Sequence, residues 1–193
     1  MSAYNAALFV HVLGVVGLFV AIGVQQWGGA QVRRAVSVEQ LRGWLGLVGA
    51  SERVYPASIA LLLAGGFFMA GTTWSFTTPW IAVGLTGLVA MIVLGILVVG
   101  RRFAAIERAA SAGGAGAVPK EVARLIERRG LWGWLFALNG TAVGILWLMT
   151  NKPGWIGSIV VVAVVTAVSG VVGAVTARPR ADPAVERSAS GRL

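Results

Sequence analysis

The chain has 193 residues, of which 57% are hydrophobic and 12% are charged, and its mean hydropathy is +0.81. Soluble domains carry charges on about a quarter of their residues, so this composition excludes an ordinary soluble protein and indicates a membrane protein. The chain has no cysteine, which excludes a disulfide framework, a thiolate metal site and a reactive thiol.

Five runs of the sequence are long enough to cross a bilayer, because about 20 predominantly apolar residues span the hydrocarbon core. None of them contains Asp, Glu, Lys or Arg. No basic residue precedes the first run and no clean cleavage site follows it, so we expect a retained span and not a signal peptide. We predict an all-α integral membrane bundle that forms one domain over residues 1–177, followed by a disordered cytoplasmic tail over residues 178–193. The predicted spans cover residues 4–24, 55–73, 79–100, 131–150 and 155–177.

Lys and Arg accumulate in cytoplasmic loops, so their positions predict the orientation of the bundle. Fifteen of the sixteen follow the first, third or fifth span, and Lys152 alone lies on the other side. The N-terminus is therefore expected outside and the C-terminus inside. The net charge of +9 is then mainly an orientation signal, and anionic lipid headgroups at the inner face are its expected partners. Nucleic acid is not an expected partner, because the basic residues are scattered beside the membrane without a recognition module.

The positions of the tryptophans agree with these boundaries, because Trp and Tyr prefer the membrane interface. All eight tryptophans fall at or near the ends of predicted spans. The outer ends carry Trp74, Trp80, Trp147 and Trp155, together with Tyr4.

Two of the inner connections are expected to contain helices. Ser37 and Gln40 make a capping-box pattern, which predicts a helix that lies along the inner interface or runs into the second span. A glycine-rich stretch over residues 113–116 precedes a second inner helix, over residues 119–129, that leads into the fourth span. The apolar face of the first inner helix consists of Leu41, Trp44, Leu45 and Val48.

Helices in a bilayer associate through small residues and a few polar ones. Gly140 and Gly144 form a GxxxG pattern in the fourth span, and we expect it to pack against another span of the same chain rather than to form a dimer. Asn139, the strongest polar residue of that span, is expected to make an interhelical hydrogen bond worth about 1 kcal/mol. The sequence leaves the oligomeric state open, and a homo-oligomer or a membrane protein partner is compatible with it.

His11 is the only histidine of the chain, and it lies inside the first apolar run. An ionisable side chain in hydrocarbon is costly, so it is a candidate for a functional site. With a rise of 1.5 Å per residue, His11 lies about 10 Å below the outer boundary. We expect an outward-facing pocket near His11, on the same side as Lys152. His11, Lys152 and Asn139 are its candidate cofactor-binding residues. Lys152 either extends to the interface or attracts a carboxylate or a propionate.

Three segments carry a resemblance to a known family. They are HVLGVVGLFVAIG in the first span, TPWIAVGLTGLVAMIVLGILVVGRR in the third, and LMTNKPGWIGSIVVVAVVTAVSG across the last loop. They resemble a bacterial family of predicted integral membrane proteins of unknown function, distantly related to the CopD copper-resistance membrane domain and to HemJ-like membrane proteins. The resemblance covers about residues 8–173 and implies the inner membrane of a bacterium. Its motifs are the first-span histidine and a turn with Met149, Lys152, Pro153 and Gly154.

A structural role for His11 is the first of three hypotheses. A neutral imidazole would then hydrogen-bond to a backbone carbonyl freed by a glycine kink, to Asn139, or to a hydroxyl group on another span. The hydroxyl candidates are Thr72, Thr141 and Ser158.

Two cofactor roles for His11 compete with the structural one. The resemblance to HemJ-like proteins implies a histidine that binds haem iron axially. The chain has no second histidine, so the other axial position would be open or would be taken by a Met or by a symmetry mate. In the copper hypothesis, His11 binds Cu(I) together with Met69 and Met149, whose soft thioethers are expected at a similar depth.

Hydrolytic catalysis is disfavoured, because all seven acidic residues belong to inner loops or the tail, a membrane's depth away from His11. No catalytic triad, pair of carboxylates, P-loop or dinucleotide fingerprint can be assembled, so any enzyme activity would rely on the redox chemistry of a cofactor. The leading hypothesis is a membrane binding or accessory protein. The alternatives are a haem-binding membrane oxidoreductase and a copper or small-solute transporter.

Labelling of introduced cysteines tests the orientation without background, because the chain has no cysteine. We expect a membrane-impermeant maleimide, applied to intact cells, to label Ser75→Cys and to leave Ser111→Cys unlabelled until the cells are opened. Labelling of Ser111→Cys but not of Ser75→Cys in intact cells would overturn the predicted orientation.

Overall fold

The computed structural model describes residues 2–177, and the predicted tail over residues 178–193 lies outside them. The described chain is all-α, with no strand, and five of its helical stretches are long and apolar enough to cross a membrane. Both findings confirm the predicted fold class. The elements are α1 (Ala3–Arg34), α2 (Val38–Glu52), α3 (Val54–Thr72), α4 (Pro79–Leu94), the π-helical turn η1 (Gly95–Gly100), α5 (Arg101–Ala112), α6 (Lys120–Ile126), α7 (Arg129–Asn151) and α8 (Trp155–Thr176).

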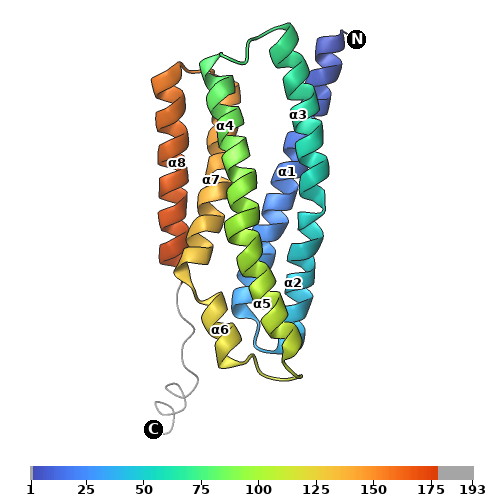
Figure 1. Ribbon diagram of the computed structural model, residues 1–193, viewed down its shortest axis with the longest axis vertical. Coiled ribbons are helices and arrows are strands. Elements are labelled where there is room, and N and C mark those ends of the chain that lie inside the picture. Colours follow the sequence, from blue (N-terminus) through green and yellow to red (C-terminus); the bar gives the residue numbers. More distant parts are fainter. Residues whose placement is uncertain (1, 178–193) are drawn as a thin grey trace, which may run out of the picture.

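The helices continue beyond the apolar runs at the end of the bundle that holds α2, α5 and α6, which we call the basic end (Figure 1). There α1 extends to Arg34, and α2 leads into α3 with a break only at Arg53. Helix α4 continues through η1 into α5. Helix α5 was not predicted from the sequence, although Phe103, Ile106 and Ala110 are buried at helical spacing along it.

The start of α2 has the predicted capping arrangement. The Ser37 hydroxyl accepts a hydrogen bond from the Gln40 backbone N–H at 3.3 Å, and the Gln40 side-chain oxygen accepts one from the Val36 N–H at 3.2 Å. These bonds satisfy backbone donors that a helix N-terminus otherwise leaves without partners. Leu41, Leu45 and Val48 of the predicted apolar face are buried and Trp44 is partly buried, so this face packs against the bundle.

The basic end has a well-packed core around Trp132. The indole N–H of Trp132 donates to the Ile126 carbonyl at 2.7 Å, and its ring meets the Phe103 ring edge-on at 6.2 Å. The Arg33 guanidinium lies 5.2 Å from the Trp132 ring and also donates to the Thr176 carbonyl at the end of α8, at 2.7 Å. One tryptophan therefore ties α1, α5, α6 and α7 together, and α8 is attached through Arg33.

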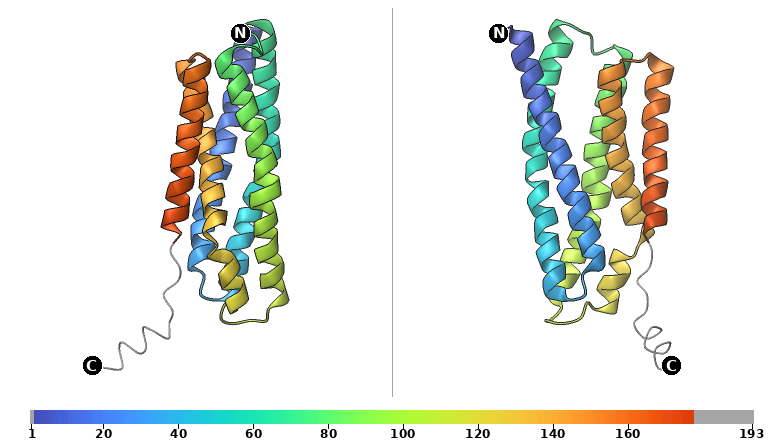
Figure 2. Two further views of the ribbon diagram at one scale, coloured as in Figure 1. Left: turned by 60° about the vertical axis from the view of Figure 1, so that its left-hand side comes forward. Right: turned by 180° about the vertical axis from the view of Figure 1, so that it is seen from behind.

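Farther from the basic end, the helices form two close sets. Helix α1 lies along α3, while α4, α7 and α8 lie together on the other side (Figure 2). A Cβ atom on Gly140 of α7 would lie 2.6 Å from the Ser169 Cβ and 2.8 Å from the Val165 carbonyl oxygen, both of α8. Gly144 approaches Val162 of α8 in the same way, with 3.2 Å to its Cα. The GxxxG pattern therefore packs within the chain, as predicted.

The outward surface of the bundle is apolar. Ile156, Val164 and Val171 of α8 are more than half exposed, and large aliphatic side chains on α1 and α4 are also exposed. Such a surface is unfavourable in water and fits the hydrocarbon of a bilayer, where helices satisfy their own backbone hydrogen bonds. The chain is an integral membrane protein with several spans.

Substitution of two glycines by alanine separates helix propensity from close packing. Gly23→Ala in α1 adds a Cβ that meets nothing within 4 Å, so we expect it to stabilise by up to about 1 kcal/mol. Gly140→Ala introduces overlap with α8 and is expected to destabilise by about 1–3 kcal/mol. Unfolding in mixed detergent micelles, followed by circular dichroism, measures both. Equal effects of the two variants would contradict the packing described for α7 and α8.

Candidate functional site

A cavity separates the two helix sets at the end opposite the basic end. Its volume is about 530 Å³, and helices α1, α3, α4 and α7 contribute its walls. The lining is aliphatic and aromatic apart from a few polar groups, and the volume lies within the range of small-molecule sites. Four of the five residues predicted to form the site line this cavity. They are His11, Met69, Met149 and Lys152.

Close contact between α1 and α3 positions His11. A Cβ atom on Gly65 would lie 2.7 Å from the His11 backbone nitrogen, and one on Gly14 would lie 2.7 Å from the Ser58 carbonyl oxygen. Neither helix could approach so closely with a larger residue at these points. The imidazole then lies beside Gly66, where a Cβ would be 3.2 Å from Nδ1.

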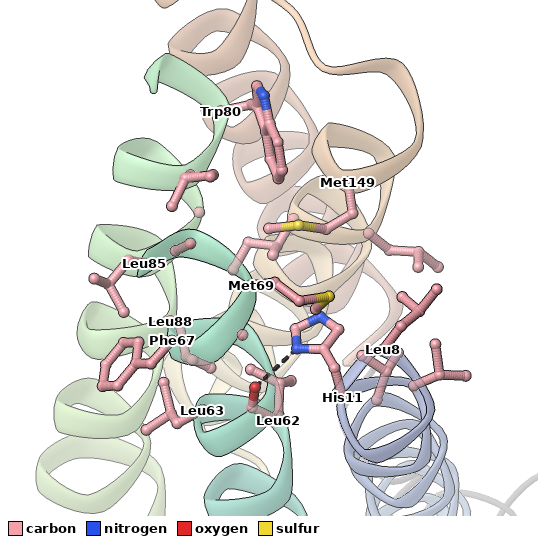
Figure 3. A pocket seen from close by; sticks show the side chains of 18 of the residues that line it. Leu8, His11, Leu62, Leu63, Phe67, Met69, Trp80, Leu85, Leu88 and Met149 are labelled. Carbon is pink, nitrogen blue, oxygen red and sulfur yellow. Dashed lines mark hydrogen bonds between the residues drawn. The ribbon is translucent and has the colours of Figure 1, made fainter. Parts of the chain in front are cut away.

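A hydrogen bond fixes the imidazole of His11. Its Nδ1 lies 2.8 Å from the backbone carbonyl oxygen of Leu62 on α3 (Figure 3). A carbonyl oxygen can only accept, so Nδ1 carries a proton, and in a neutral imidazole Nε2 would then keep its lone pair. The Leu62 oxygen has a second lone pair for its own helix, so no glycine kink is needed to free it. The site therefore contains one oriented nitrogen acceptor on a partly buried ring.

The other partners considered for His11 form different bonds. The Thr72 hydroxyl donates to the Phe68 carbonyl at 2.8 Å, within its own helix. Thr141 bonds to Ala137 and Thr166, and Ser158 bonds to Pro153.

Two thioethers share the cavity with His11. Figure 3 shows Met69 of α3 and Met149 of α7 extending into the same space as the imidazole. Gly84 of α4 provides room for Met149, since a Cβ there would lie 3.0 Å from the methionine methyl group. Among the described residues no group of three or more His, Cys, Asp or Glu side chains could hold a metal ion. One imidazole and two thioethers are instead a soft donor set.

Lys152 lies at the opening of the cavity, in an unusual backbone conformation. It ends α7 with φ 50° and ψ 51°, the only positive φ of a non-glycine residue in the described chain, and Pro153 follows it. A residue before proline is disfavoured in the right-handed helical region, so the helix ends here. The ammonium nitrogen lies 4.6 Å from the Trp74 ring and 5.8 Å from the Trp80 ring.

No carboxylate approaches Lys152 in the described part of the chain, because the acidic residues there all lie at the basic end. Its immediate neighbours are instead the two indole rings, which meet edge-on at 5.4 Å. A cation over aromatic rings is stabilised by about 0.5–1 kcal/mol at an exposed site and keeps its full charge available to an anion.

Aromatic side chains that line the cavity were not predicted from the sequence. Tyr4, Trp74 and Trp80 were expected at the membrane interface, and in the structure they also line the cavity, together with Phe67 and Phe76. The Phe67 and Phe76 rings meet edge-on at 5.7 Å. The contact of Lys152, which follows α7, with Trp74 and Trp80 near the start of α4 reveals this, and no local pattern encodes that contact.

Asn139 does not line the cavity. It lies one helical turn beyond Leu135, which approaches Gly29 of α1 nearer the basic end. Its amide nitrogen is buried and has no hydrogen-bond partner in the described chain, so the expected interhelical bond from that nitrogen is not formed there.

Comparison with protein families supports the membrane assignment. Residues 6–153 match the family described as predicted integral membrane protein (DUF2269), so the chain belongs to this family. The matched region contains His11, Met69, Met149 and Lys152. Searches of curated proteins and of solved structures found no match.

The hydrogen bond from His11 to Leu62 has a measurable structural contribution. His11→Leu removes it and is expected to destabilise by about 1 kcal/mol, since the Leu62 carbonyl keeps its helical partner. Thr86→Ala is the control, because the Thr86 hydroxyl bonds only to Ala82 of its own helix and should contribute little. Unfolding in mixed micelles measures both. Equal stability of wild type and His11→Leu would show that the bond does not hold α1 to α3.

Proposed function

We propose that this member of the DUF2269 family is a ligand-binding membrane protein, whose cavity takes an apolar molecule with an anionic group at one end. One observation carries the proposal. The cavity is mostly apolar, and it has the imidazole of His11 inside it and the ammonium group of Lys152 at its opening.

The chemistry of these groups defines the ligand. Apolar walls do not suit a sugar or a strongly hydrated ion, because the walls cannot replace its hydration. A carboxylate or propionate would pair with Lys152, which lies against aromatic rings and has no competing carboxylate nearby among residues 2–177. A hydrogen-bond donor or a metal centre of the ligand would meet Nε2 of His11, since that nitrogen can only accept or coordinate.

The location of the cavity follows from the proposed orientation. The basic end carries the Lys and Arg residues that favour the cytoplasmic side, so the cavity would open toward the outer side of a bacterial inner membrane. A ligand would then enter from the outer leaflet or from the periplasm, and the protein would act as a binding or accessory component there.

Haem is the second candidate, and the fixed imidazole of His11 favours it. Histidines that bind metals usually donate their other ring nitrogen to a carbonyl or carboxylate, as Nδ1 does to Leu62. Nε2 of His11 would hold the iron, a thioether of Met69 or Met149 would be a second ligand, and Lys152 would meet a propionate. Bound haem would supply one-electron redox chemistry. The same three soft donors also suit Cu(I), the basis of the transport alternative.

A fluorescent amphiphile tests the proposed ligand class. We expect a dansyl-labelled fatty acid to bind the purified protein and to receive energy from the tryptophans at the opening. Lys152→Gln should weaken this binding about fivefold to tenfold, because a charged contact is lost. It should leave the methyl ester of the same probe unaffected. Lys120→Gln, which removes one charge at the basic end, should change neither.

Equal affinity of the wild type for the acid and its ester would contradict the proposal, as would equal losses in the two lysine variants. An absorption spectrum of the same preparation separates the haem candidate. A Soret band that disappears in His11→Ala supports haem. No band after haem supplementation, with no copper by elemental analysis, removes both cofactor alternatives.

A further inference from the structure

A second cleft, at the basic end, carries an inference that is independent of the cavity near His11. Its volume is about 280 Å³, and it lies where η1 and α5 approach the segment between α6 and α7. Three arginines line it, and the remaining lining is apolar. The arginines are Arg101, Arg102 and Arg128, and the apolar residues are Leu97, Val98, Ala105, Leu125 and Leu131.

We propose that this cleft binds the phosphate of an anionic phospholipid, with a lipid chain on its apolar side. The guanidinium group is planar and bidentate, and it matches a phosphate better than an ammonium does. Arg101 and Arg102 come from the start of α5, while Arg128 comes from the break between α6 and α7. Within the described residues, no carboxylate pairs with any of the three.

The depth of the cleft favours a lipid over a free phosphate ion. Leu97 and Val98 belong to the end of the third apolar run, and Arg101 and Arg102 follow directly. The change from apolar to cationic lining therefore falls at the membrane boundary, where the phosphates of one leaflet lie. A free ion would use only the arginine side of the cleft, whereas a phospholipid would use both sides.

The backbone at this point is also irregular. Residues Gly95–Gly100 form a π-helical turn directly before the arginines, and such turns are rare and occur often at functional sites. At the other wall, the Arg102 guanidinium lies against the first turn of α7, 3.3 Å from where a Cβ on Gly130 would be. Gly130 therefore leaves room for that side chain beside the cleft.

Native mass spectrometry of the delipidated protein tests the site, with phosphatidylglycerol and phosphatidylcholine of equal chain length as probes. We expect wild type to bind phosphatidylglycerol at least tenfold more tightly than phosphatidylcholine. Substitution of Arg101, Arg102 and Arg128 by Gln should remove this preference. The matched control substitutes Arg34, Arg108 and Arg124 by Gln, which takes the same charge from the same end outside the cleft. It should keep the preference.

Competition with inorganic phosphate distinguishes the two sources of the anion. An excess of phosphate should leave phosphatidylglycerol bound, because the apolar side of the cleft holds the lipid. Displacement by phosphate at equal concentration would overturn the lipid assignment, and equal loss of preference in the two triple variants would show diffuse charge attraction instead. If the cleft variant does not fold, Arg128→Gln alone gives the same test, since it removes one of the three guanidinium groups.

Discussion

Close backbone contact at small residues is the constraint on which the rest of this structure depends. Lipid tails are as apolar as leucine, so burial of apolar surface does not hold helices together within a bilayer. Contact between backbones does, and here it occurs at Gly14 and Gly65 between α1 and α3, and at Gly140 between α7 and α8. The backbones of α1 and α3 are in close contact, as are those of α7 and α8, whereas the two helix sets contact each other through larger side chains.

The space between the two helix sets is filled at one end of the bundle and open at the other. At the basic end, the helices extend beyond the apolar runs, and Trp132 fills the centre with two aromatic contacts and one hydrogen bond. At the other end no described side chain fills the centre in this way, and the space between the two helix sets stays open as the cavity. The same glycine contact that holds α1 against α3 also positions His11, so packing and the candidate site share one cause.

The features that could be predicted from the sequence are those that depend on a short stretch of residues or on one unusual residue. Hydropathy indicated five membrane-spanning helices, the Ser37 and Gln40 pattern indicated the start of α2, and the only histidine and the isolated lysine indicated one shared site. Helix α5 was not predicted because it has many charged residues and few apolar ones. Its apolar face is recognised only from the burial of Phe103 and Ile106 in the folded chain. The partner of His11 was equally beyond reach, since every residue has a carbonyl and the choice of Leu62 depends on how α1 and α3 align.

In a membrane, the proposed ligand must compete with lipid chains for the cavity. An apolar cavity of this size that adjoins hydrocarbon does not favour water, so a lipid chain is the default occupant. A lipid chain and an apolar ligand make similar contacts with Leu, Ile and Phe side chains, so those contacts give little selectivity. Discrimination must come from groups that a hydrocarbon chain cannot satisfy. Among the polar groups that line the described cavity, the imidazole of His11 and the cation of Lys152 are of this kind. A ligand that satisfies both displaces lipid, and one that satisfies neither has no advantage over it.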